Sequence, residues 1–89
     1  MKPLEDYIYA WGWGLGTAGR DDLAVELFLY SIELYPGSPK SLNYFGSYLR
    51  NSDRPKEALV QFEKSLQLLE DDEIRTIRNE LVEELKREK

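Results

Sequence analysis

The segment from Gly14 to Gly19 could bind a phosphate, because it spells G-x-G-x-x-G. In dinucleotide-binding folds such glycines bring backbone amides against a pyrophosphate at the start of a helix. The aromatic residues before the segment alternate as in a strand, and Glu33 stands near the position of a ribose-binding acid. A chain of 89 residues, however, has no room for the several parallel strands of a doubly wound sheet. Because the apolar residues after position 40 are also spaced as in a helix, the sequence predicts no nucleotide site.

Other residue types that support catalysis or metal binding are scarce. The chain has no histidine and no cysteine, so the commonest general base and the thiol nucleophile are both absent. The acidic run 70–73 lacks the alternating ligands and the glycine of a calcium-binding loop. Acidic residues at the start of a helix are explained by the helix dipole. The sequence therefore predicts no catalytic residue, no metal and no cofactor, and the chain is predicted not to be an enzyme.

An internal repeat is the most informative feature of the chain. A shift of 34 residues aligns residues 5–38 with residues 39–72. The identical pairs are Gly12–Gly46, Leu15–Leu49, Arg20–Arg54, Ala24–Ala58, Phe28–Phe62, Ser31–Ser65 and Leu34–Leu68. A fixed period in this range indicates supersecondary units that stack side by side.

Each unit reads as two helices joined by a short turn. Apolar residues recur at helical spacing, and glycine, proline and charged residues interrupt them between the helices. The third helix has Pro39 at its first position, with Ser38 placed as its N-cap. The predicted helices cover residues 4–18, 23–35, 39–51 and 55–69.

The tail, residues 73–89, follows a different pattern. Ile74, Ile77, Leu81 and Leu85 form one narrow apolar stripe, and the tail lacks the aromatic–glycine pair of the units. The prediction is a capping helix, with one face against the last unit and one toward water. A free amphipathic helix that recruits a partner is the alternative.

The two units resemble the tetratricopeptide repeat, a helix–turn–helix of 34 residues. The pattern that carries the resemblance is Ile8, Trp11, Gly12, Leu15, Ala24 and Phe28 in the first unit, and Leu42, Phe45, Gly46, Leu49, Ala58 and Phe62 in the second. The closing proline of the family is Pro36 in the first unit but is replaced by Glu70 in the second. The resemblance covers about residues 5–72.

This resemblance implies an all-α fold. The expected structure is an α-solenoid of five helices in a right-handed superhelical stack, forming one domain over residues 1–89. Repeat one is residues 5–38, repeat two is residues 39–72, and the capping helix is residues 73–89. In such a stack Gly12 and Gly46 let paired helices approach, and aromatic residues such as Trp11 and Phe45 fill the space between neighbouring helices.

Two further glycines do not fit this pattern. Gly14 and Gly16 lie inside the first predicted helix, where each glycine is less favourable than alanine by up to about 1 kcal/mol. Gly12 and Gly16 share one face, which could admit a close neighbour. The sequence gives no reason for Gly14.

Ligand peptides of tetratricopeptide proteins commonly lie in a concave groove lined by the first helix of each unit. The residues that the resemblance assigns to this face are Tyr9, Trp13, Asn43, Tyr44, Ser47 and Arg50. The repeat register places Tyr9 beside Asn43 and Trp13 beside Ser47. An aromatic groove with few polar groups suits an apolar or proline-containing peptide. The alternative is that Tyr9 and Trp13 cover the open N-terminal end of the stack. For Arg50 and Lys40, solvated charges are favoured over a role as anchors.

One subtype of the family is disfavoured. Members that grip the C-terminal carboxylates of chaperones carry a clamp of lysine and asparagine on these helix faces. Here the corresponding positions hold Tyr9, Trp13 and Tyr44, and the tail offers only Arg78. A carboxylate-binding adaptor is therefore not predicted.

Charge and hydropathy narrow the classes of partner. The net charge is −5, and residues 5–38 hold six carboxylates with Arg20 as their only cation. Such a surface is a poor match for nucleic acid, which needs clustered lysine and arginine. No apolar run reaches the roughly 18 residues of a membrane span, and no signal peptide is visible. The expectation is a cytoplasmic protein without a nucleic-acid or membrane partner.

These observations predict a protein–protein interaction module. A peptide or partner protein would bind in the concave groove. A structural or docking appendage of a larger enzyme or assembly is one alternative. Self-association into a homo-oligomer is another, since two units are fewer than the usual three.

Overall fold

The computed structural model describes residues 3–87, and within that range it contains five α-helices and no strand. The helices are α1 (Leu4–Thr17), α2 (Asp21–Leu34), α3 (Pro39–Asn51), α4 (Pro55–Leu68) and α5 (Asp72–Arg87). The sequence prediction of an all-α chain is confirmed. The start of α2 lies two residues earlier than expected, because Asp21 and Asp22 occupy its first turn, where the helix dipole favours acidic side chains. The predicted end of the last helix, 88–89, lies outside the described residues.

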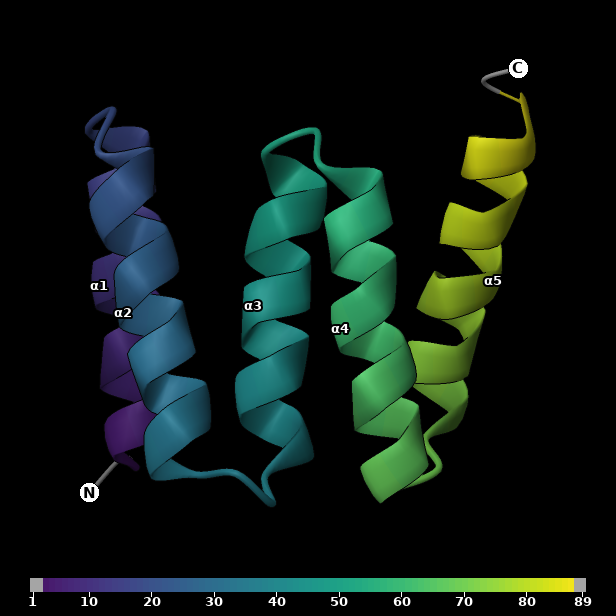
Figure 1. Cartoon of the computed structure of the whole chain (residues 1–89), viewed down its shortest axis with the longest axis horizontal. Helices are drawn as coiled ribbons and strands as arrows, with labels where there is room; N and C mark the ends of the chain where they lie inside the picture. Colours follow the sequence, from purple (N-terminus) through teal and green to yellow (C-terminus); the bar gives the residue numbers. More distant parts are fainter. Residues whose placement is uncertain (1–2, 88–89) are drawn as a thin grey trace.

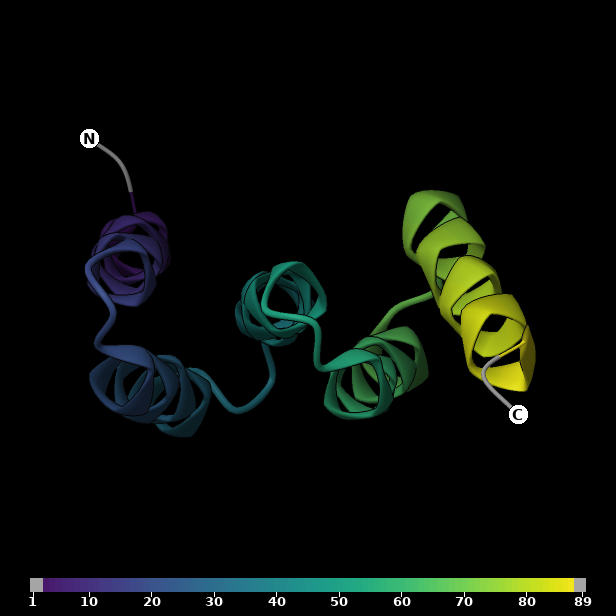
Figure 2. The same cartoon turned by 90° about the horizontal axis from the view of Figure 1, so that it is seen from above.

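The helices follow one another across the molecule in chain order, as in a helical repeat (Figure 1). Seen from above, α1 and α3 lie on one side of the stack and α2 and α4 on the other, while α5 closes the far end (Figure 2). The closest packing joins α1 to α2, α3 to α4, and α4 to α5. The first unit (α1 and α2) meets the second (α3 and α4) through α2 and α3, with a smaller contact between α1 and α3.

The two units interlock in the same way. A Cβ atom on Gly12 would lie 2.6 Å from the ring of Phe28, and one on Gly46 would lie 2.9 Å from the ring of Phe62. Both phenylalanines are fully buried. Glycine is therefore required inside α1 and α3, because each ring of the partner helix sits directly on the backbone.

Gly16 also admits a close neighbour, as the face it shares with Gly12 indicated, and that neighbour is a side chain of the next unit. A Cβ atom there would lie 2.5 Å from the ring of Tyr48, a buried residue of the next unit. No atom lies within 4 Å of the corresponding Cβ position on Gly14. One glycine thus admits the second unit, whereas the other faces open space.

The last helix packs as predicted for a cap. Ile74 and Leu81 are buried in the same core cluster as Phe62 and Leu66 of α4. The helix begins after Asp71, whose carboxylate accepts hydrogen bonds from the backbone N–H groups of two first-turn residues, at 2.9 and 3.2 Å. This cap satisfies donors that would otherwise have no partner within the helix.

One sequence prediction is wrong and another holds only in part. Trp11 does not fill a space between helices, because the residue is 63% exposed. Its equivalent Phe45 is buried against Phe28 of the preceding unit, whereas no ring among the described residues stacks on Trp11. Ser38 stands at the N-cap position of α3, as predicted, but its hydroxyl makes no capping bond to the first turn. The hydroxyl instead donates a hydrogen bond to Glu5 at 2.7 Å, which ties the start of α3 to α1.

Candidate partner-binding surface

Aromatic rings join α1 to α3. The rings of Tyr9 and Tyr44 stack with centroids 4.1 Å apart, and Trp13 meets the edge of Tyr48 at 5.8 Å. Tyr9 and Trp13 therefore face the second unit. The alternative interpretation, in which they cover the open N-terminal end, is wrong. That end carries Trp11 instead. The repeat register predicted Asn43 as the neighbour of Tyr9, whereas the ring of Tyr9 stacks on the next residue, Tyr44.

Carboxylates of the first unit anchor the tyrosines of the second. The hydroxyl of Tyr44 donates to Asp6 at 2.5 Å, and that of Tyr48 donates to Asp21 at 2.6 Å. Burial, and then the hydrogen bond to a carboxylate, raises the pKa of both phenols, because a phenolate would lose its solvation and repel its partner. Lys40 also pairs with Asp6 at 2.7 Å and is not an isolated solvated charge. These contacts fix the angle between the two units.

Three of the predicted groove residues line one pocket. Trp13 of α1 and Ser47 and Arg50 of α3 surround a space of about 400 Å³. The remaining lining residues are Asn51, Phe62 and Ile77. The pocket thus draws on α1, α3, α4 and α5, with Trp13, Phe62 and Ile77 as its apolar walls.

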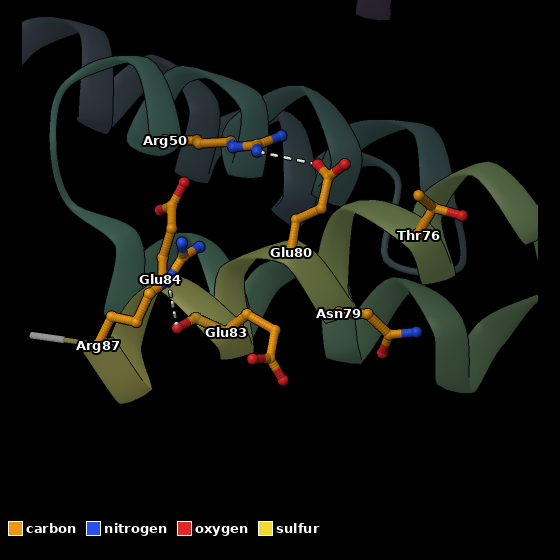
Figure 3. Close-up of a pocket in the computed structure, with 7 residues that line it drawn as sticks. All are labelled: Arg50, Thr76, Asn79, Glu80, Glu83, Glu84 and Arg87. Carbon is orange, nitrogen blue, oxygen red and sulfur yellow. Dashed lines mark hydrogen bonds and ion pairs between the residues drawn. The ribbon is translucent and has the colours of Figure 1, made fainter.

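Arg50 also lines a second, larger pocket of about 640 Å³, whose other residues belong to α5 (Figure 3). Its guanidinium points at Glu80 and pairs with it at 3.1 Å. The other lining residues, all on α5, are Thr76, Asn79, Glu83, Glu84 and Arg87. Because Arg50 is already paired with Glu80, an acidic ligand would have to compete with this ion pair.

Asn43 lies one turn before Ser47 on the same row of α3. Its Oδ1 atom is buried and accepts no hydrogen bond from the described residues. A buried acceptor without a donor is unfavourable by about 1–3 kcal/mol. Because this oxygen is enclosed and Asn43 lines none of the pockets described, the amide belongs to the packing of α3 and is not placed to meet a ligand.

The remaining predicted residues, Tyr9 and Tyr44, stack on each other. Their rings form the aromatic part of the surface that α1 and α3 share. Ile77 and Glu80 also lie beside the predicted residues, although the sequence did not predict them there. The apolar stripe of the tail contained Ile77, but the spacing along the chain gave no sign that α5 turns this residue toward Trp13.

Within residues 3–87 there is no group of three or more histidine, cysteine, aspartate or glutamate side chains arranged to hold a metal ion. Over the same residues, none of the helices has the length and apolar character needed to cross a bilayer. A comparison with models of known protein families gave no match. A search of curated proteins found no matching sequence.

Proposed function

We propose that the chain is an interaction module of the tetratricopeptide type, which binds an apolar or proline-containing peptide on the inner side of the stack. The observation that carries this proposal is the pocket shared by Trp13, Ser47, Arg50 and Ile77, which come from three different helices. Trp13 is a favoured kind of anchor, since tryptophan and arginine dominate binding energy at interfaces. That the module acts in the cytoplasm is part of the proposal.

The chemistry of the pocket selects the ligand. An apolar side chain or a proline ring would lie between Trp13 and Ile77, where burial stabilises it by about 1.5–3 kcal/mol. The hydroxyl of Ser47 and the amide of Asn51, which both line the pocket, would bond the peptide backbone. A ligand carboxylate is disfavoured, because it would have to displace Glu80 from Arg50.

A display library of peptides tests this proposal. The wild-type protein should select peptides with a shared apolar or proline motif, and Trp13→Ala should lose them. Trp11→Ala is the matched control, because it removes the same side chain from the same helix at an exposed position outside the pocket. Circular dichroism must first show that both variants keep the helical content of the wild type.

Three outcomes decide the proposal. Peptides lost by Trp13→Ala and kept by Trp11→Ala support it. Peptides lost equally by both variants contradict it, because binding would not depend on the pocket. If the folded wild type selects no peptide, the inner side is not a ligand groove and a docking appendage becomes the better explanation.

A further inference from the structure

The end of the stack before α1 is unusually apolar. We define the end face as the outer side of α1 and α2, away from α3. Its exposed apolar residues include Trp11, and Tyr30 with a side chain 53% exposed. The other large exposed members are Tyr7 and Leu34.

The repeat register shows what such a face does elsewhere in the chain. In the second unit, Phe45 stacks on Phe28 of the preceding helix at 5.8 Å, and Ser41 bonds Ser31 at 3.2 Å. The residues 34 positions earlier are Trp11 and Tyr7, and both are exposed. The end face of the first unit therefore corresponds by register to the face of the second unit that packs against α2.

The second unit also shows how α4 takes part in that interface. Gln61 and Lys64 of α4 border one pocket together with Leu29 and Ile32 of α2. Their equivalents in the first unit are Leu27 and Tyr30. Where the covered interface uses a polar and a charged residue, the uncovered end face thus has two apolar ones.

A groove between α1 and α2 has room for side chains of a docked helix. Ala10, Trp11, Gly14, Leu15 and Leu27 surround a space of about 480 Å³. Ala10 and Gly14 are small and lie one turn apart, so a neighbouring backbone can come close. On the second unit the corresponding position is taken by the single helix α2, which contacts α3 and also borders the pocket beside α4.

Charge identifies the kind of helix. Of the six carboxylates in α1 and α2, Glu5, Asp6 and Asp21 bond residues of the second unit and therefore add no charge to the end face. Two exposed glutamates remain on α2 for that face. Glu33 lies on the end face by register, because its equivalent Gln67 borders the pocket between α2 and α4. Glu26 is one turn before Tyr30. A second copy of the chain would bring the same acidic end against this one, whereas lysine and arginine beside an apolar stripe would pair with it.

We propose that the end face is a second docking site, which binds an amphipathic helix whose apolar stripe is bordered by lysine or arginine. Trp11 and Tyr30 are its anchors, and the bound helix lies on α1 and α2 as α2 lies on the second unit. This mode is the burial of an amphipathic helix in an apolar groove. The site is separate from the Trp13 pocket, and the inference does not rest on the peptide-binding proposal.

The test uses a fluorescent synthetic peptide of about four helical turns, stapled to hold its helix, with a leucine stripe bordered by lysines. A twin peptide has glutamate in place of each lysine. Binding is measured by anisotropy at low and high salt. The wild type should bind the lysine peptide, more weakly at high salt, and should not bind the glutamate twin.

The decisive variant takes residues from the second unit of the same chain. Leu27→Gln with Tyr30→Lys introduces the residues found at positions 61 and 64, and should weaken binding about tenfold or more. Val60→Lys is the matched control, since it replaces a 49% exposed apolar residue on α4 with the same change in net charge. Circular dichroism checks that all three proteins are equally helical.

Binding by the wild type and by Val60→Lys, with loss in the double variant, supports the proposal. No binding to the lysine peptide overturns it, as does equal binding of the glutamate twin or equal loss in Val60→Lys. A wild-type dimer in light scattering that the double variant abolishes would assign the face to a second copy instead. Trp13→Ala should leave this binding unchanged, which separates its outcome from that of the peptide library.

Discussion

Three glycines of α1 that look alike in the sequence have different surroundings. Gly12 lies against Phe28 within its own unit, and Gly16 lies against Tyr48 of the next unit. Gly14 has no neighbour within 4 Å of its Cβ position. Since glycine weakens the interior of any helix, only the first two are compensated by a packing contact.

Gly14→Ala is therefore expected to raise the free energy of unfolding by about 0.5–1 kcal/mol, because alanine restricts the unfolded chain and meets nothing in the helix. Gly16→Ala should lower it by about 1–3 kcal/mol, because the new methyl group would overlap the buried ring of Tyr48. Urea unfolding followed by circular dichroism measures both changes. Shifts in the same direction would show that the two sites do not differ as described.

Among the elements, α5 has the double role of covering α4 and of completing the pocket. Leu81 is fully buried in the core cluster, and Ile77 reaches the pocket beside Trp13. The outer positions of the helix are exposed and charged. A helix with this division is held by its apolar stripe and depends little on its surface charges.

Leu81→Ala should lower the free energy of unfolding by about 2–5 kcal/mol, because it leaves a cavity in the core. The control is Glu83→Ala on the exposed side of the same helix, for which little change is expected. Denaturant titration of both variants gives the comparison. A change below about 0.5 kcal/mol for Leu81→Ala would mean that α5 is only loosely attached, as in the free-helix alternative.

The helices themselves could be predicted from the sequence, because each has its own apolar period and its own turn residues. The contacts between helices could not be predicted in the same way. Ser38 occupies the predicted N-cap position of α3, yet its hydroxyl donates to Glu5 of α1 and not to the first turn of α3. Trp11 matches the buried Phe45 in register, but burial depends on a neighbour that the register alone does not supply. Within the candidate site, Trp13 and Ser47 followed from the repeat, whereas the approach of Ile77 depends on how α5 crosses the stack.

At the scale of the whole molecule, the two units are joined by phenol–carboxylate pairs. Tyr44 donates to Asp6 and Tyr48 donates to Asp21, so each bond exists only while the phenol keeps its proton. The pKa of both phenols is raised by burial and then by these bonds. The folded protein therefore holds these protons to higher pH than the unfolded chain does. The stabilisation is complete below a pH of about 10, the ordinary phenol value, and is lost as the pH rises through the raised pKa values.

We accordingly expect the free energy of unfolding to fall above a pH of about 10. The pKa of Lys40 is raised by its hydrogen bond to Asp6, which adds to the same trend. Replacing both tyrosines by phenylalanine should lower stability at neutral pH by about 1 kcal/mol per lost bond and flatten the alkaline decline. Urea titrations from neutral to alkaline pH would show this, with the exposed Tyr30→Phe as control. An equally steep decline in the double variant would contradict the assignment.

Contacts between neighbours along the chain also govern how fast this protein can form. Every close pair of helices among the described residues is consecutive in sequence, except α1 with α3. Folding therefore requires only short loops to close, and chains of such local topology reach the native state on the order of microseconds to milliseconds. A helix that docks on the end face would extend the stack by one more neighbour contact. Such growth adds stability without adding any slow, long-range search.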